Sequence, residues 1–172
     1  NGRQCKPYNR DFKNTVTRSQ RKPFMPKIIF PMLLIALTLA ACGEVEDTRP
    51  GQPVKTRQQA FKEIVKTFEP MGIMLRKKHY DADKFLELAE ALKARRDAPW
   101  AHFGPDTNYP PSKATAAVWS QAEEFEKGHQ SFIATTDALL EAAKSKDVPR
   151  ITAAYGKVHD TCQTCHKTFK DR

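Results

Sequence analysis

The chain has 172 residues, of which 40% are hydrophobic and only 7 are glycines, which fits one packed, mainly helical domain plus a targeting segment. Its net charge of +9 is concentrated near the start. Residues 1–41 hold 8 Lys/Arg and 1 Asp, whereas the remainder holds 21 Lys/Arg and 19 Asp/Glu. Because that remainder is nearly neutral and its charges are mixed, we expect no nucleic-acid partner.

A signal-peptide pattern covers residues 25–41. Lys27 precedes an apolar run over 28–41, which is short for a membrane span and typical of a signal peptide. The run ends in "LAAC", which resembles the lipobox of bacterial lipoproteins and implies lipid attachment at Cys42. An ordinary signal peptide with a chance cysteine is the alternative. The lipid would anchor the domain in the periplasm without a membrane-spanning helix, and Gly43 in place of Asp favours the outer membrane.

Two further segments flank this signal. Residues 1–24 are polar and basic and precede the methionine at which the signal should start, so we interpret them as a spurious or unprocessed extension. Residues 42–53 are acidic and contain proline and glycine without periodicity, which predicts a flexible tether. The folded domain is expected over 54–172.

The domain begins with two helical patterns, at about 54–78 and 83–96. Pro70 predicts a kink or a local break in the first, and Asp83 is the expected N-cap of the second. The inward positions in these helices are Arg57, Phe61, Ile64, Phe68, Met71 and Leu75, then Phe85, Leu88 and Leu92.

A long loop over 97–112 follows, and at that length it should pack against the domain through Trp100 and Phe103. A third helix is expected at about 113–144 and a fourth after Asp147, which serves as its N-cap with Pro149 in the first turn. Their inward positions are Val118, Ala122, Phe125, Phe132 and Leu139, then Ile151, Tyr155, Val158, Cys162, Cys165 and Phe169. With no strand pattern, these segments predict an all-α fold, an antiparallel up-down-up-down four-helix bundle.

The fourth helix carries the pattern C-x-x-C-H, formed by Cys162, Cys165 and His166. The two cysteines share a helix face, and the histidine stays on that side. This arrangement suits c-type haem, in which two thiols bond to the vinyl groups and the imidazole ligates the iron. Chance would give roughly 0.003 such matches in a chain of this composition. We therefore predict one covalent haem c, with Cys162 and Cys165 as thioethers and His166 as the axial ligand.

Three other uses of these residues are weaker. A thioredoxin-like dithiol should follow a strand and open a helix. A zinc site would need His159 beside His166 and lacks the usual spacing of two cysteine pairs. A disulfide between positions three apart on a helix would be strained. The remaining histidines have no metal-binding spacing and are expected at the surface or in loops: His79, His102, His129 and His159.

Motifs from several parts of the domain resemble cytochrome c′, the class II c-type cytochromes: "TRQQAF", "APWAHFGPDT", "VWSQAEEF" and "CQTCHKTFK". The resemblance covers about 54–172. It implies a haem near the C-terminus of the bundle and a homodimer formed through the first two helices. It also implies a basic group, here Lys170, beside the axial imidazole.

The same resemblance assigns the residue on the other face of the iron, which lies four positions after the Arg57 of the Arg-Gln pair. This residue is Phe61, where electron-transfer relatives place a methionine. A phenyl ring has no lone pair to donate, so we expect a five-coordinate iron with His166 as its sole axial ligand. Arg57 lies on the inner stripe and should reach a haem propionate or solvent. The alternative iron ligands are Met71 and Met74, further along the same helix. Since Met71 lies ten residues after Phe61, about 15 Å by helical rise, both cannot face the iron, and we expect the two methionines to be core residues.

An apolar distal side disfavours O₂, water and anions, so we predict binding of small gases, NO most of all and CO as well. The alternative is a one-electron carrier of a periplasmic respiratory or denitrification chain, although a near-neutral domain offers no strong docking patch. An enzymatic role, as a weak peroxidase or NO reductase, ranks last. Peroxidases need distal acid–base groups, and Phe61 stands where those groups would be useful.

Overall fold

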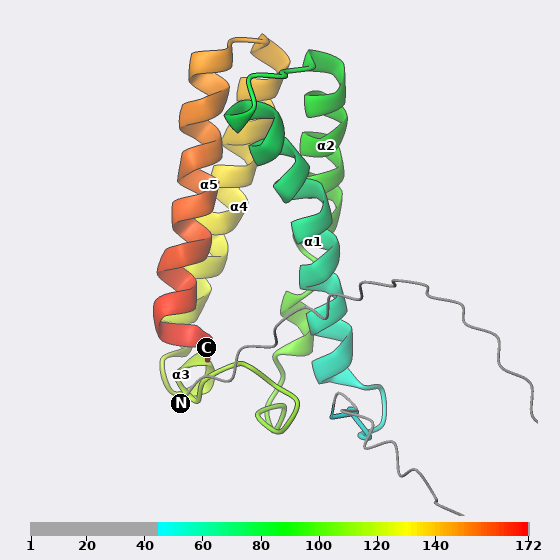
Figure 1. The fold of residues 1–172 in the computed structure, drawn as a ribbon. Helices are drawn as coiled ribbons and strands as arrows, with labels where there is room; N and C mark the ends of the chain where they lie inside the picture. The colour runs from blue at the N-terminus through cyan, green and yellow to red at the C-terminus, as the bar shows by residue number, and fades with distance from the viewer. Residues whose placement is uncertain (1–44, 172) are drawn as a thin grey trace, which may run out of the picture. The chain divides into compact units, whose positions relative to one another are not determined.

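The computed structural model describes residues 45–171 of the chain (Figure 1). The expected N-terminal extension, the signal peptide over 25–41 and Cys42 lie outside these residues. Within the described part of the chain, no helix is long and apolar enough to cross a membrane.

Four long helices alternate in direction along the chain (Figure 1). Helix α2 packs against α1 and α4, and α4 packs against α5. Between residues 45 and 171 there is no strand, and the isolated bridge between Ala114 and Lys170 is the one β-type pairing. The all-α up-down-up-down bundle is therefore confirmed. Its elements are α1 (Pro53–Arg76), α2 (Ala82–Arg95), the 3₁₀ turn η1 (Trp100–His102), α3 (Ala117–Ser120), α4 (Ala122–Ser145) and α5 (Val148–Phe169).

The expected helix over 113–144 starts later than its sequence pattern indicates. The backbone before it pairs with the end of α5: Thr115 N donates to Phe169 O at 3.1 Å, and Asp171 N donates to Lys113 O at 2.8 Å. These bonds hold residues 113–115 outside a helix. The short helix α3 follows, and the non-helical backbone of Gln121 (φ −125°, ψ 48°) separates it from α4, which begins at Ala122. Ala122 itself is exposed rather than inward.

The helix ends confirm one expected cap and correct another. Asp147 caps α5, with its carboxylate accepting from Arg150 N at 3.5 Å. The cap of α2 is Asp81, which accepts from Lys84 N at 2.9 Å, rather than Asp83 as expected. Pro70 lies inside α1, which continues through it without the local break that was one expectation.

The start of α1 is capped by Asp47, which lies before the helix in the chain. Asp47 is almost fully buried, and its Oδ2 accepts from Val54 N at 2.9 Å and Lys55 N at 3.1 Å, while Tyr109 donates its hydroxyl to Oδ1 at 2.9 Å. Burial by itself would raise the pKa of Asp47, but these hydrogen bonds and one from Arg49 N lower it. A flexible tether was expected over 42–53, and the structure instead holds its later part, from Asp47, against the bundle.

Helices α1 and α5 touch at one end of the bundle and separate towards the other, where α5 finishes (Figure 1). At the closed end Phe68 stacks on Tyr155, with ring centroids 4.3 Å apart. The hydrophobic core includes Met71, Phe85, Leu92, Leu139, Ile151 and Val158. The C-x-x-C-H residues lie near the other end, where the backbones of α1 and α5 diverge (Figure 1).

Gly72 packs closely against Tyr155, so a substitution at Gly72 tests the packing at the closed end of the bundle. A Cβ added at Gly72 would overlap the hydroxyl of Tyr155, whereas a Cβ at Gly156 on α5 would meet nothing within 4 Å. We expect Gly72→Ala to destabilise the fold by about 1–3 kcal/mol through overpacking. The matched change Gly156→Ala should stabilise by up to about 1 kcal/mol, because glycine weakens a helix interior. Urea unfolding measures both, and equal stabilities would contradict this packing.

Candidate haem site

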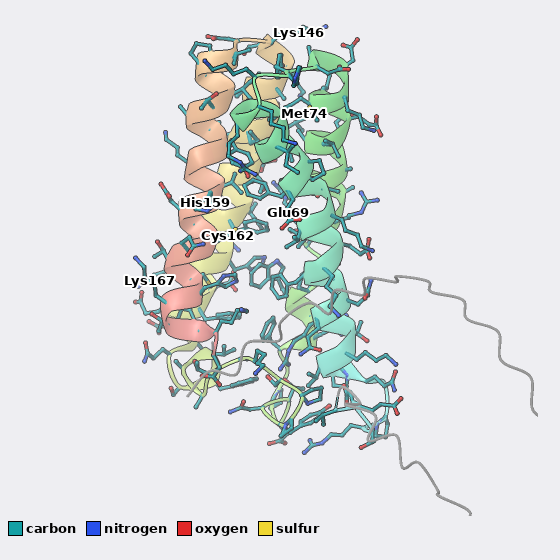
Figure 2. All side chains as sticks on the ribbon, viewed as in Figure 1. Glu69, Met74, Lys146, His159, Cys162 and Lys167 are labelled. Carbon is teal, nitrogen blue, oxygen red and sulfur yellow. The ribbon has the colours of Figure 1, made fainter. Side chains whose placement is uncertain are left out.

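The two cysteines of the C-x-x-C-H pattern lie in the last turns of α5, and neither forms a disulfide. Both are half-buried, and Cys162 packs against the core. Figure 2 shows Cys162 on α5 at a height similar to that of Glu69 on α1. Burial raises the pKa of the Cys162 thiol to about 11, with Cys165 adding to the effect. Burial raises the pKa of the Cys165 thiol as well.

Thiols with raised pKa values are protonated at neutral pH. A redox dithiol needs a lowered pKa, because the thiolate is the nucleophile and the metal ligand. The surroundings of Cys162 and Cys165 therefore weigh against the dithiol and zinc alternatives.

The axial candidate His166 follows on the same helix. Partial burial of its ring lowers the pKa of the imidazole, and nearby Lys170 acts in the same direction. A neutral imidazole keeps the lone pair that an iron ligand needs. Lys170 is the C-cap of α5, and the bridge to Ala114 holds its backbone. It therefore lies close enough to His166 to act on it electrostatically, although its role beside the iron stays a prediction.

Phe61 belongs to a group of rings that we call the aromatic cluster. Its ring centroid lies 5.6 Å from that of Trp100 and 6.2 Å from that of Phe103. Trp100 and Phe103 thus pack the long loop against the bundle, as expected. The cluster draws on α1, the loop, α4 and α5, and it consists of Phe61, Trp100, Phe103, Phe125, His129, Phe132 and Phe169.

Arg57 lies one turn before Phe61 and is buried, but its partners are in the loop. Nη1 donates to His102 O at 3.0 Å and to Thr107 Oγ1 at 2.9 Å. Nη2 donates to Thr107 O at 2.9 Å and to Ser112 Oγ at 2.6 Å. Burial lowers the pKa of Arg57, whereas Tyr109 and Asp47 act in the opposite direction. In this structure the guanidinium fastens the loop to α1. Its expected contact with a haem propionate stays a prediction.

The two methionines considered as core residues behave as such. Met71 is fully buried among the hydrophobic core residues, and Met74 is partly buried against them. Neither contributes to the aromatic cluster.

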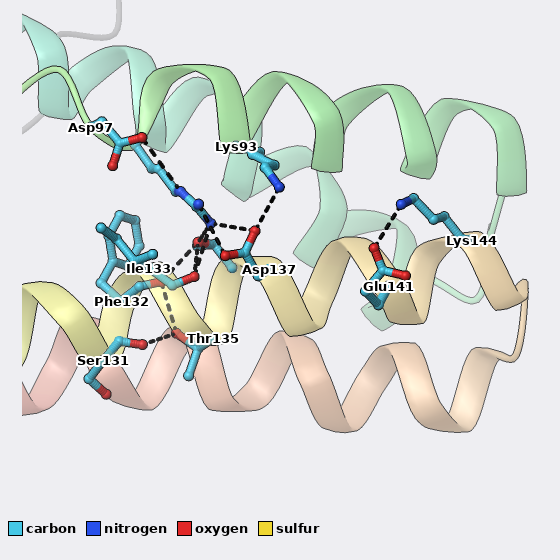
Figure 3. A network of polar contacts seen from close by, with 11 residues as sticks. Lys93, Asp97, Ser131, Phe132, Ile133, Thr135, Asp137, Glu141 and Lys144 are labelled. Carbon is cyan, nitrogen blue, oxygen red and sulfur yellow. Dashed lines mark hydrogen bonds and ion pairs between the residues drawn. The ribbon is translucent and has the colours of Figure 1, made fainter.

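A polar network around Asp137, which the sequence analysis did not predict, joins the end of α2 to α4 (Figure 3). Arg96 donates to Ile133 O at 2.9 Å and to Thr136 Oγ1 at 2.8 Å, and it pairs with Asp137. The carbonyl of Arg96 accepts from Trp100 Nε1 at 2.7 Å. Arg96 lies four residues after the inward Leu92, and that spacing could have indicated its burial.

His129 was expected at the surface, and the structure corrects this. Its side chain is only 15% exposed, and its ring stacks on Trp100 with centroids 4.1 Å apart. The position lies four residues after Phe125 and three before Phe132, so it is on the inward face of α4. The helical spacing therefore indicates burial, whereas the polar residue type favours exposure, and at this position the spacing is the correct guide.

A sequence profile of the family described as Cytochrome C' matches residues 52–170. The chain belongs to the cytochrome c′ family. It is 31% identical over 125 residues to a cytochrome c' from Alcaligenes xylosoxydans xylosoxydans, covering 72% of this chain and 97% of that one. It is 32% identical over 126 residues to a cytochrome c' from Rubrivivax gelatinosus, covering 72% and 98%.

Among solved structures, one similar fold is the nitric oxide complex of a leucine-to-alanine variant of cytochrome c prime from Alcaligenes xylosoxidans. The TM-score is 0.68 at 31% identity, covering 74% of this chain and 99% of that one. Membership of the cytochrome c′ family implies a covalently bound c-type haem.

The residues present fit such a haem. Two thiols without a disulfide and an imidazole with a lowered pKa lie within about one turn of α5, and the Phe and Trp rings of the aromatic cluster supply apolar walls. Gly128 on α4 faces Cys165, where a Cβ would lie 3.7 Å from Sγ. The absence of a side chain at Gly128 leaves room beside the thiol. Cys162, Cys165 and His166 would hold the haem, which supplies an iron able to bind a small ligand.

Proposed function

We propose that this member of the cytochrome c′ family is a five-coordinate haem protein that binds small gaseous ligands, nitric oxide above all. One haem c would be held by Cys162 and Cys165, with His166 as the axial ligand. The observation that carries the proposal is Phe61, a side chain without a lone pair that lies within the aromatic cluster on α1. A five-coordinate iron follows if this ring occupies the sixth position.

The chemistry of the distal side supports NO as the ligand. The rings packed around Phe61, Trp100 and Phe103, offer a bound gas an apolar surrounding rather than a distal acid or base. Bound O₂ gains from a hydrogen-bond donor, whereas NO and CO are less demanding. The similar structure from Alcaligenes xylosoxidans is an NO complex, which supports the same ligand here.

The setting of this function is also part of the proposal. The signal pattern supports export to the periplasm, and Cys42 would carry a lipid that keeps the domain near the outer membrane. There it would capture NO and protect the cell from it. A homodimer through α1 and α2 is proposed on the family resemblance.

Spectra of the purified haem protein test the proposal first. We expect a high-spin ferric EPR signal and a five-coordinate ferrous optical spectrum. A low-spin, six-coordinate resting state would contradict gas binding at an open iron and would favour one-electron transfer.

Stopped-flow NO binding to Phe61→Ala then tests the distal residue. Removing the ring should speed binding by about tenfold or more, which corresponds to about 1.4 kcal/mol less barrier. Phe68→Ala is the matched control, because Phe68 stacks on Tyr155 and is outside the aromatic cluster. An unchanged rate in Phe61→Ala, or the same acceleration in both variants, would refute the distal role of Phe61.

A further inference from the structure

One nitrogen in the aromatic cluster lacks a partner in the described polypeptide. Nε2 of His129 is buried and forms no hydrogen bond. A buried polar atom without a partner destabilises the fold, and native proteins normally satisfy such atoms with protein, water or a ligand. The structure therefore raises the question of what Nε2 binds in the haem-loaded protein.

The orientation of the ring is set by its other contacts. Nδ1 lies 3.3 Å from Oε2 of Glu126, whose Oε1 accepts from Gln130 Nε2 at 2.6 Å. The imidazole plane is inclined by 28° to the indole of Trp100, on which it stacks. Glu126 is exposed and holds the solvent side of the ring, so Nε2 is directed away from solvent.

The neighbours of His129 belong to the haem site. Gly128, the preceding residue, faces the thiol of Cys165. Trp100, on which the imidazole stacks, contacts Phe61. His129 thus follows the α4 position that faces a cysteine of the C-x-x-C-H pattern, and its ring stacks on a residue that contacts Phe61. The group that enters this space in a cytochrome c′ is the haem, whose periphery is hydrocarbon except for two carboxylates. A carboxylate is therefore the one peripheral haem group that could bond to Nε2.

A second candidate partner for this carboxylate is Arg57, which bonds to the loop in this structure. Arg57 directs all four hydrogens of its terminal nitrogens to loop acceptors, namely two carbonyls and two hydroxyls. Those bonds would have to break before Arg57 could turn to the haem. His129 needs no such rearrangement, because Nε2 forms no hydrogen bond to the described residues.

We propose that His129 binds a haem carboxylate through Nε2. With Glu126 at Nδ1 and the haem carboxylate at Nε2, the imidazole carries a proton on each nitrogen and forms two charge-assisted hydrogen bonds. His129 is then a haem-binding residue that orients the group from α4, in addition to the attachment from α5. This inference rests on the haem and not on which gas the iron binds.

A crystal structure of the haem-loaded wild-type protein tests the contact directly. Nε2 should lie about 2.7–2.9 Å from a haem carboxylate oxygen. A water molecule at Nε2, or Arg57 bonded to the carboxylates with His129 unpaired, would overturn the proposal.

Two variants test the same bond in solution. His129→Phe keeps a ring against Trp100 but removes both nitrogens, whereas His129→Gln keeps a donor without the charge. His79→Phe is the matched control, because His79 is exposed between α1 and α2. The readouts are the carboxylate bending band in resonance Raman spectra and the reduction potential.

We expect the band to shift in His129→Phe and the reduction potential to fall, because a positive charge near the haem is lost. His129→Gln should give a smaller band shift and a lowered potential, and His79→Phe should leave both readouts unchanged. An unaltered band in His129→Phe would refute the bond. If that variant fails to retain haem, His129→Gln and the wild-type crystal structure decide the question.

Discussion

Replacing Phe61 with methionine should convert the five-coordinate, high-spin iron into a six-coordinate, low-spin one. Phe61 lies within the aromatic cluster on α1, and a thioether at that position would offer a lone pair where the phenyl ring offers none. Most of the ferric EPR signal should change from high-spin to low-spin. NO binding should slow, because the methionine must first leave the iron.

Phe68→Met is the matched control for this substitution. Phe68 lies seven residues further along α1, where it stacks on Tyr155, outside the aromatic cluster. Its replacement should leave the spin state unchanged. A Phe61→Met variant that stays high-spin would show that this side chain is not directed at the iron. The same spin change in both variants would indicate a nonspecific effect on the fold.

Replacing both Cys162 and Cys165 with alanine should abolish covalent haem attachment. Both thiols are uncommitted in the structure, and each would form one thioether. The intact mass after denaturation should therefore equal that of the polypeptide alone. Each single variant should keep one thioether and attach haem in lower yield.

His159→Ala distinguishes the haem from the zinc alternative. His159 is exposed and lies one turn before Cys162, where a zinc site would need it as a ligand. If these residues hold haem, His159→Ala should retain full covalent attachment, whereas His166→Ala should lose the axial ligand and its optical signature. Loss of a bound metal in His159→Ala would contradict the haem site.

The sequence by itself determined the four long helices and their order, and it predicts the attachment residues. These features depend on short-range relations along the chain. The inward apolar positions of α5 and the spacing of Cys162, Cys165 and His166 are patterns that lie within a few helical turns. The bounds of α1 and α2 were correct to within two residues for the same reason. The family resemblance then supplied Phe61, and the aromatic cluster supports that assignment without testing the iron contact itself.

The tertiary structure decided where polar groups find partners. Asp47 caps α1 from upstream of the helix, and residues 113–115 pair with the end of α5 rather than extending α4. Arg57 bonds to a loop about fifty residues further along the chain, so its partners could not be found from helical periodicity. His129 was misplaced because residue type was given more weight than its position on the face of α4.

The physical reason for this division is the range of the interactions. The periodicity of apolar residues decides which face of a helix is buried, and this pattern involves residues only three and four positions apart. A buried hydrogen-bonding group needs a partner at a set distance and angle, and the fold brings that partner from anywhere in the chain. Only the assembled bundle could therefore show that both terminal nitrogens of Arg57 bond to the loop and that Nε2 of His129 is buried without a partner among the described residues.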